Sequence, residues 1–249
     1  MITSPASNGL SGPRLFARYA FPPNAKGYCG PEDVSSVLTM ISAPDSGPDL
    51  RDWAGKFDGA WPYLSFIASV TGIGDPLDRR VVEAYWLGSD LLRSVPLLDF
   101  GNSLRDRFRD RNSGGWAQLA DSLSGAAVPH HSFHVFCVYP WVGLLRAGHV
   151  GPALEVLDRC RIRVGSVASV HEDVAIVETN ELRYSDGILS NREPITLPFS
   201  CEPRAFGAGD IVTLHWDWVC DVVTNAQARR LVGIESEHLT LANSAHLVA

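Results

Sequence analysis

The spacing of apolar residues changes near residue 160, and this change constrains the fold of the 249-residue chain more than any other feature. Before it, apolar side chains recur at helical intervals, as in the series Val34, Val37, Leu38 and Ile41. After it, short apolar runs alternate as strands do, as in residues 195–199. The chain is therefore expected to consist of a helical part followed by a strand-rich part.

The helical part is expected to extend from Phe16 to about Val156. Asp75 precedes a proline, and this pair predicts a helix that Asp75 caps. Pro140 is predicted to split a second helical segment, Phe133–Leu145, because proline lacks the N–H that a helix interior needs. Further helices are expected after Gly30-Pro31, over Arg105–Asn112 and over Trp116–Leu123.

The strand-rich part contains five short apolar runs within about 75 residues, which is typical of a small β-barrel. Turn-prone pairs at Asp186-Gly187 and Gly209-Asp210 separate the runs, and a short helix is expected from Asn225. The runs are Ile162–Val170, Val174–Val177, Ile195–Phe199, Ile211–Trp216 and Val219–Val223.

These patterns predict an α+β protein with a domain boundary near residues 151–158. Residues 1–15 are expected to form a flexible tail, because they are rich in Gly, Ser and Pro. Residues 16–156 are expected to form an all-helical domain, and residues 157–249 a small barrel with a short final helix.

Two motifs at the ends of the strand-rich part resemble a known family. Cys160-Arg-Ile-Arg-Val-Gly165-Ser-Val167 is similar to the opening Cys-x-x-x-Pro-Gly-x-Val of the HypC/HupF/HybG family, with Val164 in place of the proline. The stretch from Gly209 through His215 to Arg229 resembles the end of that family, where a strand ending in Val-His precedes an apolar strand and a helix. The resemblance covers residues 158–235.

The resemblance implies an OB-like barrel chaperone of nickel–iron hydrogenase maturation. In that family the opening cysteine holds an iron that carries cyanide and carbon monoxide, and the partner is the hydrogenase large subunit or another maturation factor. Carried over, Cys160 would ligate iron and His215 would be its neighbour in the site. The alternatives are a cysteine packed beneath the barrel and a core histidine with satisfied hydrogen bonds.

The local sequence around Cys160 also suits a metal-binding thiolate. Arg159, Arg161 and Arg163 flank it, and a guanidinium directed at the thiol would lower its pKa. A thiolate is the soft donor that low-spin iron prefers, and the imidazole of His215 could accept the thiol proton.

A second candidate, Cys29, lies in the helical part between Gly27 and Gly30. It directly precedes the helix expected after Pro31, where the positive helix end would stabilise a thiolate. Cys29 is therefore a candidate catalytic nucleophile or metal ligand. The alternative is a tight loop whose cysteine is packed and inert.

A histidine cluster is the third candidate. His130 and His134 are four residues apart, so that both would lie on one helical face and could chelate a metal. His131 and Cys137 are weaker candidates for contacting a cofactor. Because aromatic residues surround the cluster, the alternative is that these histidines are hydrogen-bonded packing residues.

Charge and cysteine content restrict the cellular role. The formal net charge is −7 and the chain has no Lys/Arg-rich block, so that binding to nucleic acid or an anionic membrane is not expected. The five cysteines form no Cys-x-x-Cys motif, and the N-terminus does not resemble a signal peptide. Reduced thiols in the cytoplasm are therefore expected.

Three hypotheses follow from the sequence. The first is a metallocentre-assembly protein that binds iron, or iron with its cyanide and carbonyl ligands, through Cys160 and His215. The second is an enzyme that uses Cys29 and the histidines of the helical part to make or process a small ligand. The third is a non-catalytic adaptor that docks a maturation partner.

Overall fold

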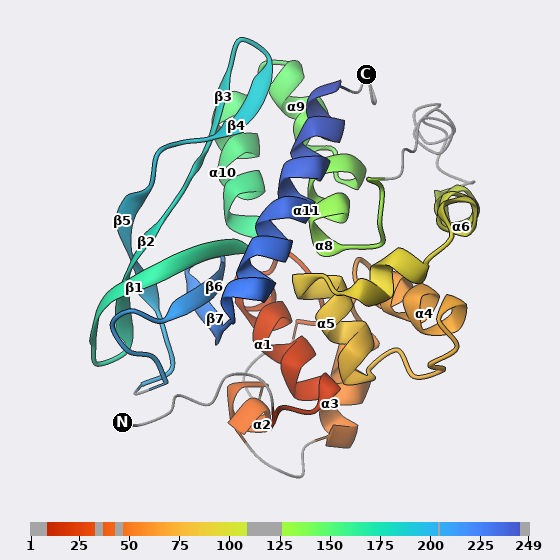
Figure 1. Ribbon diagram of the computed structural model, residues 1–249, viewed down its shortest axis with the longest axis horizontal. Helices are drawn as coiled ribbons and strands as arrows, with labels where there is room; N and C mark the ends of the chain where they lie inside the picture. Colours follow the sequence, from red (N-terminus) through yellow and green to blue (C-terminus); the bar gives the residue numbers. More distant parts are fainter. Residues whose placement is uncertain (1–8, 33–36, 43–46, 109–125, 204, 245–249) are drawn as a thin grey trace.

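The computed structural model describes residues 9–32, 37–42, 47–108, 126–203 and 205–244. Helices occupy the first part of the chain and strands the second, and a long helix follows the strands (Figure 1). The predicted order of a helical part and a sheet is thus confirmed. The expected helix over Trp116–Leu123 lies outside the described residues.

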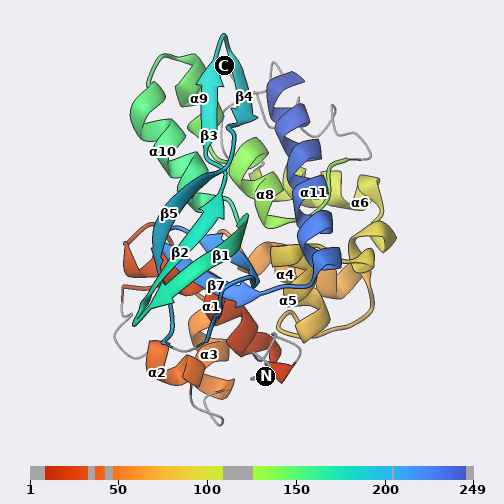
Figure 2. The same cartoon turned by 60° about the vertical axis from the view of Figure 1, so that its left-hand side comes forward.

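The described residues before the first strand form a series of helices and helical turns. They are α1 (Gly12–Ala25), α2 (Val37–Ser42), α3 (Gly47–Ala54), α4 (Trp61–Val70), α5 (Arg79–Leu87), η2 (Asp90–Ser94), α6 (Leu97–Phe108), α8 (His131–Phe133), η3 (His134–Val138), α9 (Trp141–Arg146) and α10 (Val150–Cys160). In Figures 1 and 2, α4 and α6 lie on the side of the molecule opposite the sheet.

Two helix boundaries test the sequence rules. Asp78, not Asp75, caps α5, because its side chain accepts a hydrogen bond from the backbone N–H of Arg80. Asp75 instead accepts from the N–H of Leu77 and pairs with Arg51 at 2.8 Å. The break at Pro140 is confirmed, since η3 ends before it and α9 begins directly after it.

The strand pairings form a closed ring in the order β1-β2-β5-β7-β6. These strands are β1 (Arg163–His171), β2 (Val174–Thr179), β5 (Ile195–Ser200), β6 (Ile211–His215) and β7 (Trp218–Val222). All neighbours are antiparallel except β5 and β7, which meet in parallel at Ser200 and Trp218. The five predicted runs correspond to these five strands.

A separate hairpin, β3 (Leu182–Ser185) with β4 (Ile188–Asn191), projects from the ring. Asp186 and Gly187 join its strands with φ angles of 54° and 79°. Two successive positive φ angles match the right-handed twist of a hairpin, and glycine adopts such an angle readily. The turn predicted at this pair is confirmed.

The helical part and the strand-rich part share one apolar core. The cluster that contains Phe16 and Trp86 continues into Trp216, Cys220 and Val223 of the strand-rich part. A smaller cluster fills the ring of strands, with Val177, Phe199 and Leu214 among its members. The expected boundary between residues 156 and 157 falls inside α10, which continues through it.

The two ends of the chain also differ from expectation. Helix α1 begins at Gly12, inside the segment expected to be a tail, and Leu15 is fully buried in the core. Residues 1–8 lie outside the described residues. The final helix, α11 (Asn225–Ser244), is 20 residues long rather than short. It packs against α5, α8 and η3 because Leu231, Leu239 and other apolar residues on one face meet the helical core (Figure 2).

The buried guanidinium of Arg161 joins three parts of the chain. It donates to Asp158 at the end of α10, to Glu235 of α11 and to the carbonyl of Asn180 after β2. Its side chain is only 2% exposed. Asp158 also accepts from the N–H of Leu182 at 2.8 Å, so that the carboxylate holds β3 as well.

Among the described residues, none of the helices combines the length and the apolar character that crossing a membrane requires.

Replacing Arg161 should be strongly destabilising. Arg161→Met keeps the length of the side chain but leaves the buried carboxylate of Glu235 without its cation and Asp158 with Arg163 alone. Removal of one partner from a buried ion pair costs about 3–5 kcal/mol, and urea unfolding should show a loss of this size. The matched control is Arg192→Met, whose pair with Glu181 at 3.8 Å is more exposed and should change stability by less than about 0.5 kcal/mol. Equal losses in both variants would contradict this role.

Buried histidines should make the fold acid-sensitive. His238 of α11 is fully buried between Ser132 and the carbonyl of Ala126, and burial lowers its pKa to about 3. At pH values below 6.5, the ordinary pKa of histidine, the unfolded chain binds a proton on His238 that the folded chain does not bind. The free energy of unfolding therefore decreases as the pH is lowered from 6.5 to 3. His238→Phe should flatten this pH dependence by up to about 1.4 kcal/mol per pH unit in urea unfolding. The control is His171→Phe, which replaces an exposed histidine and therefore removes no buried group.

Candidate functional site

A cavity of about 120 Å³ lies between the helical part and the end of β6. Its walls are mainly aromatic and apolar, and they come from α1, α5, α10 and the turns beside them. Among the lining side chains are Tyr85, Trp86, Trp141 and Trp216. The few polar groups that reach this cavity therefore stand out against its apolar wall.

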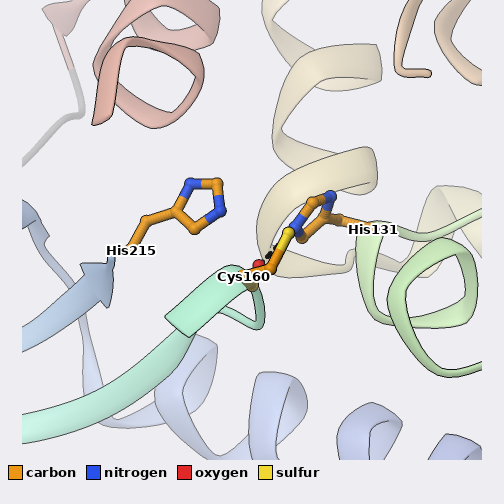
Figure 3. A group of neighbouring side chains, drawn as sticks. All are labelled: His131, Cys160 and His215. Atoms are coloured by element: carbon orange, nitrogen blue, oxygen red, sulfur yellow. Dashed lines mark hydrogen bonds between the residues drawn. The ribbon is translucent and has the colours of Figure 1, made fainter. Parts of the chain in front are cut away.

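Three potential metal ligands converge at the cavity. They are His131 at the start of α8, Cys160 at the last residue of α10 and His215 at the last residue of β6. The sulfur of Cys160 and one ring nitrogen of each histidine lie within 4.8 Å of one another. All three side chains are buried. Figure 3 shows the imidazole of His215 on one side of Cys160 and the imidazole of His131 on the other.

His215 is held in one orientation by a hydrogen bond to the backbone. Its Nδ1–H donates to the carbonyl oxygen of Tyr19 at 2.6 Å, which leaves the lone pair on Nε2. This Nε2 is buried and has no hydrogen-bond partner among the described residues. A carbonyl that fixes the tautomer of an imidazole is the usual support behind a metal-binding histidine.

His131 is also fixed by hydrogen bonds. Its Nε2–H donates to the carbonyl oxygen of Cys160 at 2.8 Å (Figure 3), and its Nδ1 lies 3.4 Å from the hydroxyl of Tyr85. Coordination through Nε2 would move the proton to Nδ1, where the oxygen of Tyr85 can accept it. Both tautomers of His131 therefore have a partner.

The thiol of Cys160 is neutral without a cation, because burial raises its pKa well above the ordinary value. The expectation that the flanking arginines lower this pKa is wrong, because each guanidinium is paired with a carboxylate. The pairs are Arg159–Asp217, Arg161–Asp158 and Arg163–Asp158, at 2.9, 3.0 and 3.5 Å. A metal ion that binds here must displace the thiol proton.

Cys160 and His215 lie where the two sequence motifs meet in space. Cys160 ends a helix and does not open the first strand, because α10 continues to it and β1 begins at Arg163. The imidazole cannot hold the thiol proton, because burial lowers the pKa of His215 well below its ordinary value. The site is therefore a neutral thiol beside two neutral imidazoles.

Cys29 lines the same cavity but is not one of the three converging ligands. Burial raises its pKa to about 12, so that the predicted thiolate at a helix N-terminus is wrong. The structure describes α2 only from Val37 onward, and residues 33–36, where the expected helix begins, lie outside the described residues. The thiol is thus partly buried and neutral.

The predicted pair of His130 and His134 is separated by an irregular backbone. His130 caps α8 in an extended conformation, and its Nδ1 accepts from the N–H of Ser132 at 3.0 Å. Because His130 precedes the helix, the spacing of four residues does not lie within one regular helical face; a π-helical turn follows from His134 to Val138. His134 lines the cavity, whereas His130 does not.

Cys137 is buried and lies apart from the three converging residues. It lies in the π-helical turn, outside the cavity lining, and burial raises its pKa to about 12. His131, predicted only as a weaker cofactor contact, is the histidine of this segment that meets Cys160. The spacing of residues in the sequence does not predict the contact between His131 and Cys160, because the two residues are 29 positions apart.

One protein family matches nearly the whole chain. The family of unknown function DUF6390 matches residues 8–249. The chain belongs to the DUF6390 family. Searches of curated proteins and of solved structures gave no match. The DUF6390 match includes the helical part and the strands together, and therefore all three converging ligands.

Proposed function

We propose that this DUF6390 protein is a metallocentre-assembly protein that binds iron at Cys160, His131 and His215. The observation that carries the proposal is the convergence of one sulfur and two imidazole nitrogens of buried residues within 4.8 Å at a cavity. In this role the protein binds iron, or iron with small diatomic ligands, and transfers it to a hydrogenase large subunit or another maturation factor.

The donor set supports a transition metal. Thiolate and imidazole suit iron, zinc, cobalt and copper, whereas magnesium and calcium prefer oxygen ligands. The unpartnered Nε2 of His215 supports the same conclusion, because a buried nitrogen lone pair gains a partner when a metal binds. With three protein ligands, a metal ion keeps a coordination position for a further ligand, as in catalytic zinc sites.

The hydrogenase-maturation part of the proposal rests on the resemblance to the HypC/HupF/HybG family. That resemblance calls for an OB-like barrel with a cysteine before its first strand and a histidine at the end of a later strand. Cys160 precedes β1 and His215 ends β6, and the strand pairings form a closed ring. In this proposal the helical part supplies a third ligand, His131.

The enzyme hypothesis has one observation in its favour, because Cys29 and His134 line the same cavity as the three ligands. A thiol with a pKa of about 12 is a weak nucleophile at neutral pH. We therefore favour a role in which the cavity holds a metal. The adaptor hypothesis predicts no metal binding at all.

Cobalt(II) binding tests the metal site directly. The wild-type chain should bind one cobalt ion with the near-ultraviolet charge-transfer band of a cobalt–thiolate bond. Cys160→Ala should lose the band, and His215→Ala should weaken the affinity by about 100-fold or more, because a changed supporting residue alone costs 10–100-fold. Cys137→Ala removes a buried thiol outside the cavity and should behave as wild type.

Iron content gives the second measurement. Anaerobically purified wild-type chain should contain iron that Cys160→Ala lacks and Cys137→Ala retains. Wild-type chain that binds neither cobalt nor iron, or that binds them equally after Cys160→Ala, would eliminate the proposal and favour the adaptor.

A further inference from the structure

A second polar group, the imidazole of His134, reaches the cavity apart from the three ligands. Its Nδ1 lies 3.3 Å from the hydroxyl of Tyr63, and its Nε2 has no hydrogen-bond partner among the described residues. The side chain is 93% buried, since its exposed fraction is 7%. An unpaired polar atom in such a place is costly unless something binds to it.

The neighbours of Tyr63 fix which nitrogen of His134 carries the proton. The guanidinium of Arg107 lies over the Tyr63 ring at 4.7 Å and hydrogen-bonds its side chain. Arginine only donates, so that the Tyr63 oxygen accepts from Arg107. The buried O–H of Tyr63 needs an acceptor of its own, and Nδ1 of His134 is the acceptor that the described residues place beside it. The proton of the neutral imidazole is therefore on Nε2, which is a hydrogen-bond donor. Burial keeps this ring neutral by lowering its pKa to about 3.

Gly59 provides the space in front of this donor. A Cβ atom at Gly59 would lie 3.2 Å from Nε2 of His134 and 3.4 Å from the hydroxyl oxygen of Tyr139. Gly59, His134 and Tyr139 all line the cavity. Two polar atoms thus border one space that a side chain at position 59 would fill.

We propose that the cavity binds a small ligand between two points, the metal at Cys160, His131 and His215 and the donor Nε2–H of His134. The presence of a metal at the first of these two points rests on the proposed function. The ligand is a small anion or carbonyl compound, because the metal calls for a lone-pair donor at one end and His134 calls for a hydrogen-bond acceptor at the other. The hydroxyl of Tyr139 is a second group that such an acceptor can reach.

The cavity limits the size and polarity of this ligand. Its volume is about 120 Å³, which is smaller than the pockets of about 300–1,000 Å³ that hold drug-sized ligands. A molecule of a few non-hydrogen atoms fits this space. The aromatic wall around Trp86 and Trp141 offers little to a ligand with further polar groups.

Azide binding to the cobalt-loaded chain tests the proposal. Azide coordinates a metal through one terminal nitrogen and accepts hydrogen bonds at the other. His134→Phe keeps a ring of similar shape without the donor, and should weaken azide binding by about tenfold with unchanged cobalt affinity. The cobalt absorption spectrum measures both affinities in one titration.

A substitution on the opposite side of the same space gives an independent test. Gly59→Ala should also weaken azide binding, because its methyl group occupies the space beside Nε2, and it should leave the cobalt affinity unchanged. Gly55→Ala is the matched control, because its Cβ would meet only ordinary contacts at 3.6 Å. It should bind cobalt and azide as the wild type does.

The outcomes separate this inference from the proposed function. Wild-type chain without cobalt binding overturns both. Cobalt binding together with unchanged azide affinity in His134→Phe and Gly59→Ala overturns only the two-point ligand site. If His134→Phe fails to fold, Gly59→Ala alone decides, and unchanged azide affinity there contradicts the inference.

Discussion

The candidate site depends on the buried guanidinium of Arg161, because it fixes the end of the helix that carries Cys160. Arg161 follows the cysteine directly, and its partners Asp158, Glu235 and Asn180 come from α10, α11 and the segment after β2. A buried cation needs all of its hydrogen bonds, so that these segments can meet in only one arrangement. These hydrogen bonds fix the position of the Cys160 sulfur. None of the groups that form them ionises the thiol.

The sequence pattern predicted the fold well where local rules apply. Alternating apolar residues located the five strands of the ring, and Asp186-Gly187 located the hairpin turn. Two motifs also identified Cys160 and His215 as candidates that share a site. The pKa expectations failed because they considered neighbours in sequence, whereas Arg159 and the other guanidiniums are paired across the fold. His131 was underestimated for the same reason, since only tertiary packing brings α8 to the end of α10.

The expected division into two domains does not describe how the helical part and the strand-rich part pack. A change of periodicity indicates a change of secondary structure, but it does not show where one apolar core ends. Here the core of the helical part includes Trp216 and Leu231 from the strand-rich part. The ligands follow the same arrangement, with His131 from the helical part, His215 from the strands and Cys160 from the helix between them.

The position of Glu235 in α11 has a consequence for how the protein is made. On the ribosome, every ligand of the site emerges before α11, yet Arg161 has its full set of partners only when Glu235 has folded against it. The three side chains therefore emerge before the segment that completes the hydrogen bonds of Arg161, and their final arrangement belongs to the folded chain.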